Sequence, residues 1–548
     1  MTATAPAPET PAGGLTHRQI LTVLSGLMLG MFLASLDQTI VSTAMRTIAD
    51  RLHGQTAQAW VSTAYLVTST VATPLYGKLS DMYGRKPFYL FAIVIFVVGS
   101  MLCGLAHSIY ELAAYRALQG IGAGGLMSLA FAIVGDLVPP RQRGRYQGYF
   151  MSVFGTSSVL GPVLGGFFAG QTTLLGIDGW RWIFYINVPI GIVALIVVSR
   201  VLNLPRRRSE HRIDYLGAAL LTSAVVPLLL LAEKGREWGW GSATSLSLLA
   251  LGILSLVLFV PRERKMGEEA ILPLRVFSSP VFNVASTVAF LVGIGMFGGL
   301  TSLPLYLQIV RGESPTRAGL QLIPFMVGII AASAVTGRIL MRTGRYKIFP
   351  ILGTATMAVA MLLFSTLTVD TPIARTMAFM VVMGIGLGLS MQTLVIAVQN
   401  ALPPRDMGVA TSSVTFFRSM GGTFGVAAAL ALLFGSLAGN IQARARAAHL
   451  PPQIIEKFKH ASALNDTSII KTLPPLIRRV VLEGFADSMH TVFVAVFVLL
   501  IPAFVLAFFI KEVPLRNLGG AAAAKAESLA ELDPETQADS ARAETAVL

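Results

Sequence analysis

The feature of this sequence that most constrains its fold is a succession of long apolar runs that are almost free of charge. Each run extends for about 20 residues, the length that an α-helix needs to cross the hydrocarbon core of a membrane. Because lipid cannot satisfy exposed backbone polar groups, runs of this length are expected to form helices there. We count fourteen runs, at 20–45, 58–77, 88–107, 109–135, 147–170, 182–203, 214–232, 243–261, 281–309, 316–341, 348–367, 372–399, 408–436 and 489–510.

The composition supports a membrane protein and excludes several other classes. Only 13% of the 548 residues are charged, against about 25% in a soluble globular protein, so soluble domains would lack the charge to cover their surfaces. The single cysteine, Cys103, excludes a disulfide scaffold, a thiolate zinc site and an iron–sulfur cluster. The seven histidines show no metal-site spacing and belong to no Ser/His/Asp set. The sequence therefore predicts no metal site and no enzyme.

The distribution of lysine and arginine predicts the orientation of the helices. The net charge of +14 would suit nucleic-acid binding in a soluble protein, but most basic residues of the short loops fall on one side of the predicted bundle. Such loops favour the cytoplasm. We therefore expect a multi-pass membrane protein with both termini in the cytoplasm and no nucleic-acid partner. The run Arg206–Arg208 also suits contact with anionic lipid heads.

Three short motifs occur twice in the same order, which indicates an internal duplication. The pairs are Gly77–Leu79 with Gly337–Ile339, Gly120–Gly122 with Gly384–Gly386, and Pro139–Arg141 with Pro403–Arg405. Their order along the predicted helices favours two six-helix halves with two extra helices between them. The predicted units are a cytoplasmic N-terminal tail 1–19, an N-terminal half 20–203, an insert 204–275, a C-terminal half 276–512 that includes an external loop 437–488, and a disordered cytoplasmic tail 513–548.

Four motifs resemble those of one transporter superfamily. Gly77–Pro87 resembles the loop signature of the major facilitator superfamily between helices two and three. Leu36–Val41 is similar to the signature of its 14-spanning drug:proton antiporters, and Arg116–Gly120 to its proton-coupling motif. Gly161–Gly166 resembles a motif characteristic of exporters. The resemblance implies an all-α integral membrane protein with the major facilitator fold and fourteen transmembrane helices, located in a bacterial cytoplasmic membrane.

Asp37 is the only acidic residue in the interior of a predicted span, and a buried ionisable group is costly enough in a membrane to suggest a function. At 1.5 Å per residue, Asp37 lies about 12 Å and Arg116 about 10 Å from the external side, so the two are level. Opening or closing such a site changes how readily the carboxyl group binds a proton. We expect Asp37 and Arg116 to couple transport to protons; a permanent ion pair between helices one and four is the alternative.

The motif around Asp81 is predicted to latch the two halves together on the cytoplasmic side in one state. Gly77 and Gly84 allow a tight turn close to neighbouring helices. Asp81 is placed to accept hydrogen bonds from a helix N-terminus or to pair with a basic group, and Arg85 belongs to the same motif. The second copy has Met341 in place of Asp81, so the latch is predicted to be asymmetric. A solvated turn is the alternative.

The exporter-like motif gives the fifth span a smooth face that contains a proline. Small residues let membrane helices approach closely, and proline bends a helix. Gly161, Pro162, Gly165 and Gly166 are therefore predicted to seal against a helix of the other half and to part from it during transport. Tight packing alone is the simpler alternative.

A mostly apolar substrate cavity is expected in the centre of the bundle. Arg418 lies near mid-membrane with no acidic residue at its depth in the second half, so it is a candidate for bonding carbonyl groups, binding an anionic group or facing the cavity. The other candidates are aromatic and amide side chains: Tyr65, Gln119, Gln308, Gln392, Phe416 and Phe417.

Together these features predict a proton-coupled secondary active exporter that moves hydrophobic or amphipathic drugs, including cationic ones, out of the cytoplasm by alternating access. Protons are the coupling ion and no cofactor is expected. The expected partners are a small amphipathic substrate and membrane lipids, and the expected state is a monomer. A dedicated exporter of an endogenous lipid, siderophore or antibiotic is the alternative. A channel fits less well, because one buried acid and duplicated halves suit alternating access better than a ring-lined pore.

Overall fold

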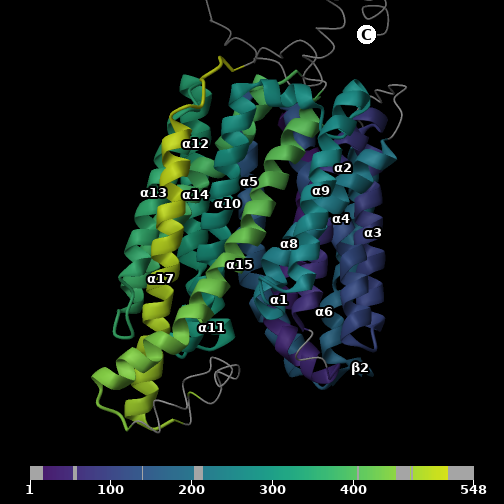
Figure 1. The fold of residues 1–548 in the computed structure, drawn as a ribbon. Coiled ribbons are helices and arrows are strands. Elements are labelled where there is room, and N and C mark those ends of the chain that lie inside the picture. Colours follow the sequence, from purple (N-terminus) through teal and green to yellow (C-terminus); the bar gives the residue numbers. More distant parts are fainter. Residues whose placement is uncertain are drawn as a thin grey trace, which may run out of the picture.

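The computed structural model describes residues 17–53, 58–138, 140–202, 214–403, 406–451, 470 and 473–515. These residues form a bundle of long helices that lie roughly side by side (Figure 1). Twelve helices of the described part are long and apolar enough to cross a membrane, which confirms the predicted all-α membrane fold. The two other predicted spans, 58–77 and 214–232, lie on α2 and α8, and the count of fourteen membrane crossings stays a prediction.

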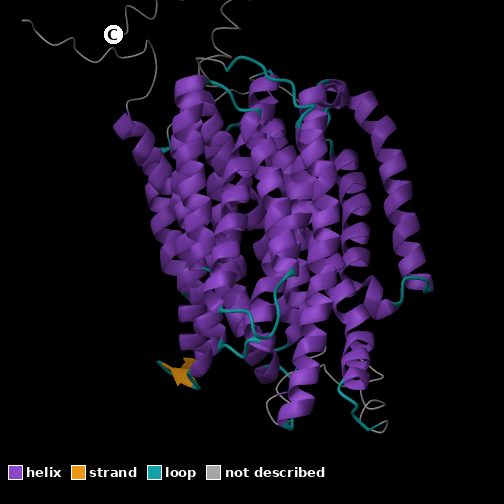
Figure 2. Cartoon of the chain, turned by 90° about the vertical axis from the view of Figure 1, so that its left-hand side faces the viewer, coloured by secondary structure: helices purple, strands orange, loops and turns teal. Residues whose placement is uncertain are grey.

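The first part of the bundle consists of α1 to α7 and one small hairpin. Its two strands pair antiparallel, with Thr173 opposite Asp178, and lie at one end of the bundle (Figure 2). Leu175 and Gly176 connect them with positive φ values of 53° and 80°, as a tight hairpin turn requires. The elements are α1 (His17–Arg51), α2 (Gln58–Tyr83), α3 (Arg85–Leu105), α4 (Ile109–Leu137), α5 (Pro140–Gly170), β1 (Thr173–Leu174), β2 (Ile177–Asp178), η2 (Gly179–Arg181), α6 (Trp182–Tyr185) and α7 (Asn187–Val201).

The second part of the bundle follows two inserted helices. The insert consists of α8 (Tyr215–Trp238) and α9 (Ala243–Met266), followed by the short helical turns η3 (Gly267–Glu269) and η4 (Leu274–Ser278). The second part comprises α10 (Pro280–Leu305), η5 (Tyr306–Val310), α11 (Pro315–Gln321), α12 (Ile323–Thr343), α13 (Ile348–Ser365), α14 (Ile373–Ala401), α15 (Met407–Ala447) and α17 (Pro475–Ala507).

The helices of the two parts pack in the same pattern. In the first part, α1 packs against α5 and α7, α4 packs against α2 and α3, and α3 packs against α7. In the second part, α10 packs against α15 and α17, α14 against α12 and α13, and α13 against α17. The recurrence is what a duplicated six-helix unit produces, while the boundaries of the halves stay predictions.

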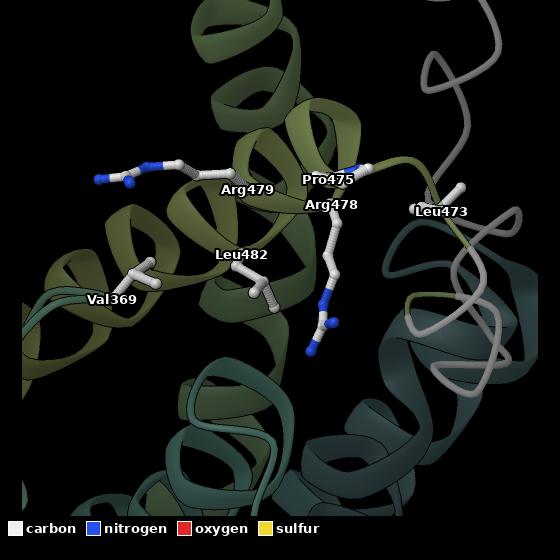
Figure 3. A pocket seen from close by; sticks show the side chains of 6 residues that line it. All are labelled: Val369, Leu473, Pro475, Arg478, Arg479 and Leu482. Carbon is white, nitrogen blue, oxygen red and sulfur yellow. The ribbon is translucent and has the colours of Figure 1, made fainter.

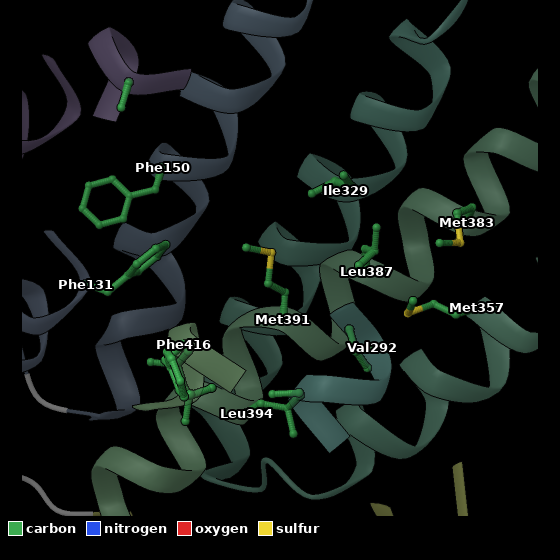
Figure 4. Close-up of a cluster of buried hydrophobic side chains, with 14 of the residues drawn as sticks. Phe131, Phe150, Val292, Ile329, Met357, Met383, Leu387, Met391, Leu394 and Phe416 are labelled. Carbon is green, nitrogen blue, oxygen red and sulfur yellow. The ribbon is translucent and has the colours of Figure 1, made fainter. Parts of the chain in front are cut away.

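Two seams join the parts, one between α2 and α15 and one between α5 and α12. The inserted helix α8 packs against both α2 and α15 and runs beside that seam (Figure 1). A buried apolar cluster extends across the parts: it includes Phe131 of α4 and Phe150 of α5 together with Met391 and Leu394 of α14 and Phe416 of α15 (Figure 4). The rings of Phe131 and Phe150 meet edge to face with their centroids 5.4 Å apart.

The two ends of the bundle differ. The end at which α17 finishes, at the top of Figure 1, is the one that the charge distribution predicts to be cytoplasmic; we call it the inner end and the opposite one the outer end. At the outer end α15 continues to Ala447 and α17 begins at Pro475, which corrects the predicted loop 437–488. Arg444 Nε lies 2.6 Å from Asp487 Oδ2, so these two charges pair across two antiparallel helices.

Some predicted segments fall on residues that the structure does not describe. Residues 452–469 of the predicted external loop and the run Arg206–Arg208 lie outside the described residues. The same holds for most of the predicted tails, 1–19 and 513–548, of which only His17 to Gln19 and Val513 to Leu515 are described.

Candidate functional site

Asp37 lies in a buried polar network inside the first part of the bundle. Its side chain is fully buried. Arg116 Nη1 donates to Asp37 Oδ2 at 2.5 Å, while Gln119 Nε2 and Asn187 Nδ2 donate to Oδ1 at 2.9 and 2.8 Å. The structure thus brings together Asp37 of α1 and Arg116 of α4, which the sequence places at the same depth.

Two residues predicted for the substrate cavity surround this ion pair instead. Gln119 Oε1 accepts a second hydrogen bond from Arg116 Nη1 at 2.8 Å. The ring of Tyr65 lies under the guanidinium, 4.0 Å from its carbon to the ring centroid, an arrangement in which the aromatic face attracts the cation. Both Tyr65 and Gln119 are buried, so they hold Arg116 against the carboxylate of Asp37.

Asn187 and Ser100 complete the network and were missed by the sequence reasoning. Asn187 begins α7 and donates to Ser100 Oγ at 2.9 Å as well as to Asp37. Ser100 of α3 in turn donates to the carbonyl oxygen of Phe184 at 2.9 Å. The available signal was the presence of an amide inside the apolar run 182–203, since a buried amide needs partners.

Asp81 connects the two parts of the bundle at the inner end. Its carboxylate accepts hydrogen bonds from the backbone N–H of Gly408 at 3.1 Å and of Val409 at 3.0 Å, both in the first turn of α15. A helix N-terminus has unsatisfied N–H groups and a partial positive charge, which favour a carboxylate there. Arg85 lies between Asp81, at 2.5 Å, and Asp136 of α4, at 2.7 Å, and so holds Asp81 in position.

Glycines permit this contact. A Cβ at Gly77 would lie 2.6 Å from the Cβ of Ser412 and 2.9 Å from the carbonyl oxygen of Gly408, so the close approach of α2 and α15 at this point requires a residue without a side chain. Gly84, which follows the end of α2, has a φ of 100°, a conformation that favours glycine. Met341 stands where Asp81 would be in the second copy, and its thioether cannot form the same charge-assisted bonds.

The glycines of the exporter-like motif face α1 of the same part, which corrects the predicted contact with the other half. A Cβ at Gly161 would lie 2.5 Å from the Cβ of Thr39, and one at Gly165 would lie 2.8 Å from the carbonyl oxygen of Ile40. The close approach of α1 and α5 therefore depends on these glycines. Small residues let a helix approach closely, but they do not select which neighbour it approaches.

Pro162 is the member of this motif that contacts the second part. It lies inside α5, and a Cβ at Gly319 of α11 would be 2.8 Å from Pro162 Cγ. Gly166 is exposed. In this motif, Gly161 and Gly165 thus pack within the first part of the bundle, whereas Pro162 contacts the second part.

The other predicted cavity residues do not form one cluster. Gln308 lies on η5 and is exposed, whereas Phe416 is buried and its ring centroid is 5.5 Å from that of Phe417. Arg418 and Gln392 are buried, with 8% and 3% of their surface exposed. Within the described residues, neither of these two side chains has a hydrogen-bond or ion-pair partner.

A cavity of about 460 Å³ lies at the outer end, away from all of these residues. It is lined by Val369, Leu473, Pro475, Arg478, Arg479 and Leu482 (Figure 3). Because none of the predicted site residues lines it, it is distinct from the predicted substrate cavity. Among the residues that the structure describes, no cluster of histidine, cysteine, aspartate and glutamate is arranged to hold a metal ion.

Comparison with known proteins places the chain in one family. The sequence model of the Major Facilitator Superfamily matches residues 27–426. The chain is 40% identical over 497 residues to the uncharacterized MFS-type transporter Rv1877 of Mycobacterium tuberculosis (strain ATCC 25618 / H37Rv). This match covers 90% of this chain and 70% of the relative. It is 34% identical over 515 residues to the multidrug transporter protein MdtP of Bacillus subtilis (strain 168), with coverages of 90% and 94%.

The fold agrees with this assignment. The structure of the proton:xylose symporter XylE matches with a TM-score of 0.57 at 15% identity, and the match covers 91% of this chain and 97% of the symporter. The chain belongs to the Major Facilitator Superfamily and is a multi-pass membrane transporter rather than an enzyme.

Proposed function

We propose that this transporter exports hydrophobic or amphipathic drugs from the cytoplasm in exchange for protons. The observation that carries the proposal is the fully buried carboxylate of Asp37, held by three donors from two other helices. The similarity to MdtP, which is named as a multidrug transporter, supports the substrate class. Rocking of two duplicated halves around a central site is the general way in which such folds alternate access.

Asp37 is the proposed proton-binding group. In this state its two oxygens accept hydrogen bonds from Arg116, Gln119 and Asn187. A carboxyl group that takes up a proton becomes neutral and no longer attracts a cationic partner. Protonation therefore favours a state in which α4 or α7 has moved relative to α1, and this links proton binding to the movement of helices.

The contact at Asp81 controls access to the inner end in the proposed cycle. We infer that the inner end is closed while Asp81 binds the first turn of α15. We infer that in this closed-inside state the substrate leaves to the outside and a proton enters. Release of the Asp81 contact then opens the inner end, where the proton leaves and the next substrate binds.

The test uses inverted membrane vesicles in which respiration acidifies the lumen. In vesicles with the wild-type chain, cationic dyes, antibiotics or amphipathic drugs should collapse part of the pH gradient as they exchange for protons. Asp37→Asn should abolish this response. Asp178→Asn is the matched control, because Asp178 is a partly exposed carboxylate of the outer hairpin, paired with Arg181. A wild-type response from Asp37→Asn vesicles would refute proton coupling at this residue.

A double variant separates proton coupling from a purely structural ion pair. Removing one partner of a buried ion pair costs about 3–5 kcal/mol, because the other charge is left without compensation. Asp37→Asn should therefore lower the melting temperature, and adding Arg116→Gln should restore part of it. The double variant is expected to stay inactive in the vesicle assay. If it recovers drug-dependent proton exchange together with stability, the pair only holds α1 and α4 together.

A further inference from the structure

A second polar site lies between α14 and α15, and the proposed cycle does not use it. Gln399 of α14 donates to Thr411 Oγ1 of α15 at 2.7 Å. Because α15 follows α14 after a short turn, the two helices run in opposite directions. Two helical turns back along α14 and two turns forward along α15 therefore lead the same way, about 10 Å deeper into the bundle, on the same helix faces. These steps reach Gln392 and Arg418.

Gln392 and Arg418 therefore lie at a similar depth on neighbouring helices. Both polar atoms of the Gln392 amide are buried without a partner, and no described residue forms a hydrogen bond or ion pair with the Arg418 side chain. Both are more than nine-tenths buried. An unpaired buried amide costs about 1–3 kcal/mol, and an unpaired buried charge costs more. The buried arginines Arg85 and Arg116, by contrast, each have a carboxylate partner. The second part of the bundle thus carries hydrogen-bond donors that a bound ligand could satisfy.

The surroundings of this pair are apolar. Met391 and Leu394, which flank Gln392 on α14, and Phe416 of α15 belong to the buried cluster drawn in Figure 4. A ligand that satisfies the two donors therefore has an apolar body and one anionic group. A carboxylate matches best, because one of its oxygens can accept from the guanidinium and the other from the amide NH₂.

We propose that Arg418 and Gln392 bind the carboxylate of an amphipathic organic acid. This inference rests on the proposed export function and names acidic amphiphiles as one substrate class. It places the proton-binding carboxylate of Asp37 in the first part of the bundle and the acid-binding donors in the second, so that proton and cargo are held by different halves.

The test measures binding to the purified full-length chain in detergent at neutral pH. The probes are the fluorescent acid pyrenebutyrate and its uncharged primary amide, which share one apolar body. Since a hydrogen bond to a charged group contributes about 1.5–3 kcal/mol, the wild-type chain should bind the acid about tenfold or more tightly than the amide. Arg418→Met should abolish this preference and leave amide binding within about twofold. Gln392→Leu should reduce acid binding about fivefold.

Stability supplies a second readout that a merely structural role would not give. Because Arg418 is a buried charge without a described partner, Arg418→Met should melt at a higher temperature than the wild type when no ligand is present. Arg444→Gln is the control: it removes an arginine of the same helix that is paired with Asp487, and it should keep the acid preference.

Three results would overturn the proposal: equal binding of acid and amide by the wild type, an acid preference that survives Arg418→Met, or a melting temperature lowered by Arg418→Met. The binding assay needs no proton gradient. Failure of the Asp37 vesicle assay therefore refutes proton coupling and leaves the acid site testable, whereas failure here leaves the export proposal standing.

Discussion

Replacing Asp81 by asparagine should weaken the contact that holds α2 against the start of α15. Asp81 accepts backbone hydrogen bonds from Gly408 and Val409 at 3.1 and 3.0 Å, and a bond to a charged acceptor contributes about 1.5–3 kcal/mol. Asparagine has one acceptor oxygen and would keep one neutral bond of about 0.5–1.5 kcal/mol. The net loss is about 1.5–5.5 kcal/mol, and since about 1.4 kcal/mol is a factor of ten, the open population should rise about tenfold or more.

Cysteine labelling measures that population. Ser412 of α15 is 1% exposed and faces Gly77 of α2, so a cysteine there is accessible only when the seam opens. In a Cys103→Ser background, Ser412→Cys should react slowly with a membrane-impermeant maleimide added to inverted vesicles. Adding Asp81→Asn should speed the reaction by the same factor of about ten or more, because the rate follows the open fraction when opening and closing are fast.

Asp136→Asn is the matched control. Asp136 also pairs with Arg85, but α2, α3 and α4 all belong to the first part of the bundle, so its loss removes a carboxylate without removing a bond to α15. It should change the labelling rate by less than threefold or so. If Asp81→Asn leaves the labelling rate within twofold of its parent, the Asp81 contact does not hold the inner end closed and the reasoning fails.

Three further predictions concern packing and the insert. Gly77→Val should lower the melting temperature, since overpacking costs about 1–3 kcal/mol; an unchanged melting temperature would show that the seam has room. Gly161→Leu should likewise destabilise the protein through α1, while leaving the cysteine labelling rate unchanged. Arg262→Gln removes the partner of Asp214, which caps α8 by accepting from the Gly217 N–H at 2.9 Å. Hydrogen exchange at Gly217 should accelerate; unaltered exchange would show that the cap is independent of Arg262.

The apolar runs predicted where the helices cross the membrane, because the hydrocarbon core imposes both the length and the composition of a span. They did not predict where a helix ends once it leaves the membrane. Arg444 lies beyond the end of the apolar run 408–436 and Asp487 lies before the start of the run 489–510. Even so, α15 and α17 include both residues, and the two charges pair with each other. Such a helix end depends on a partner helix that is distant in sequence, which a single window of sequence does not contain.

The same reasoning explains what was predictable in the site. Asp37 and Arg116 could be paired from the sequence because the rise of a helix is constant, so depth follows from counting residues. Asn187 could not be placed, because its contact depends on how α7 is rotated about its own axis. The predicted partner of Gly161 was wrong for a related reason. A face of small residues indicates that a helix packs closely against a neighbour, but only the assembled bundle shows that the neighbour is α1.

Because of the insert, the two seams between the parts of the bundle differ in how they face the surrounding bilayer. α8 packs against α2 and α15 together, so it stands between that seam and the lipid. A compound dissolved in the membrane could pass sideways between α2 and α15 only by displacing α8, whereas the α5–α12 seam is formed without it. Two parts with the same packing pattern would otherwise offer equivalent lateral routes. With α8 in place, the α5–α12 seam is the one of the two that the insert leaves uncovered.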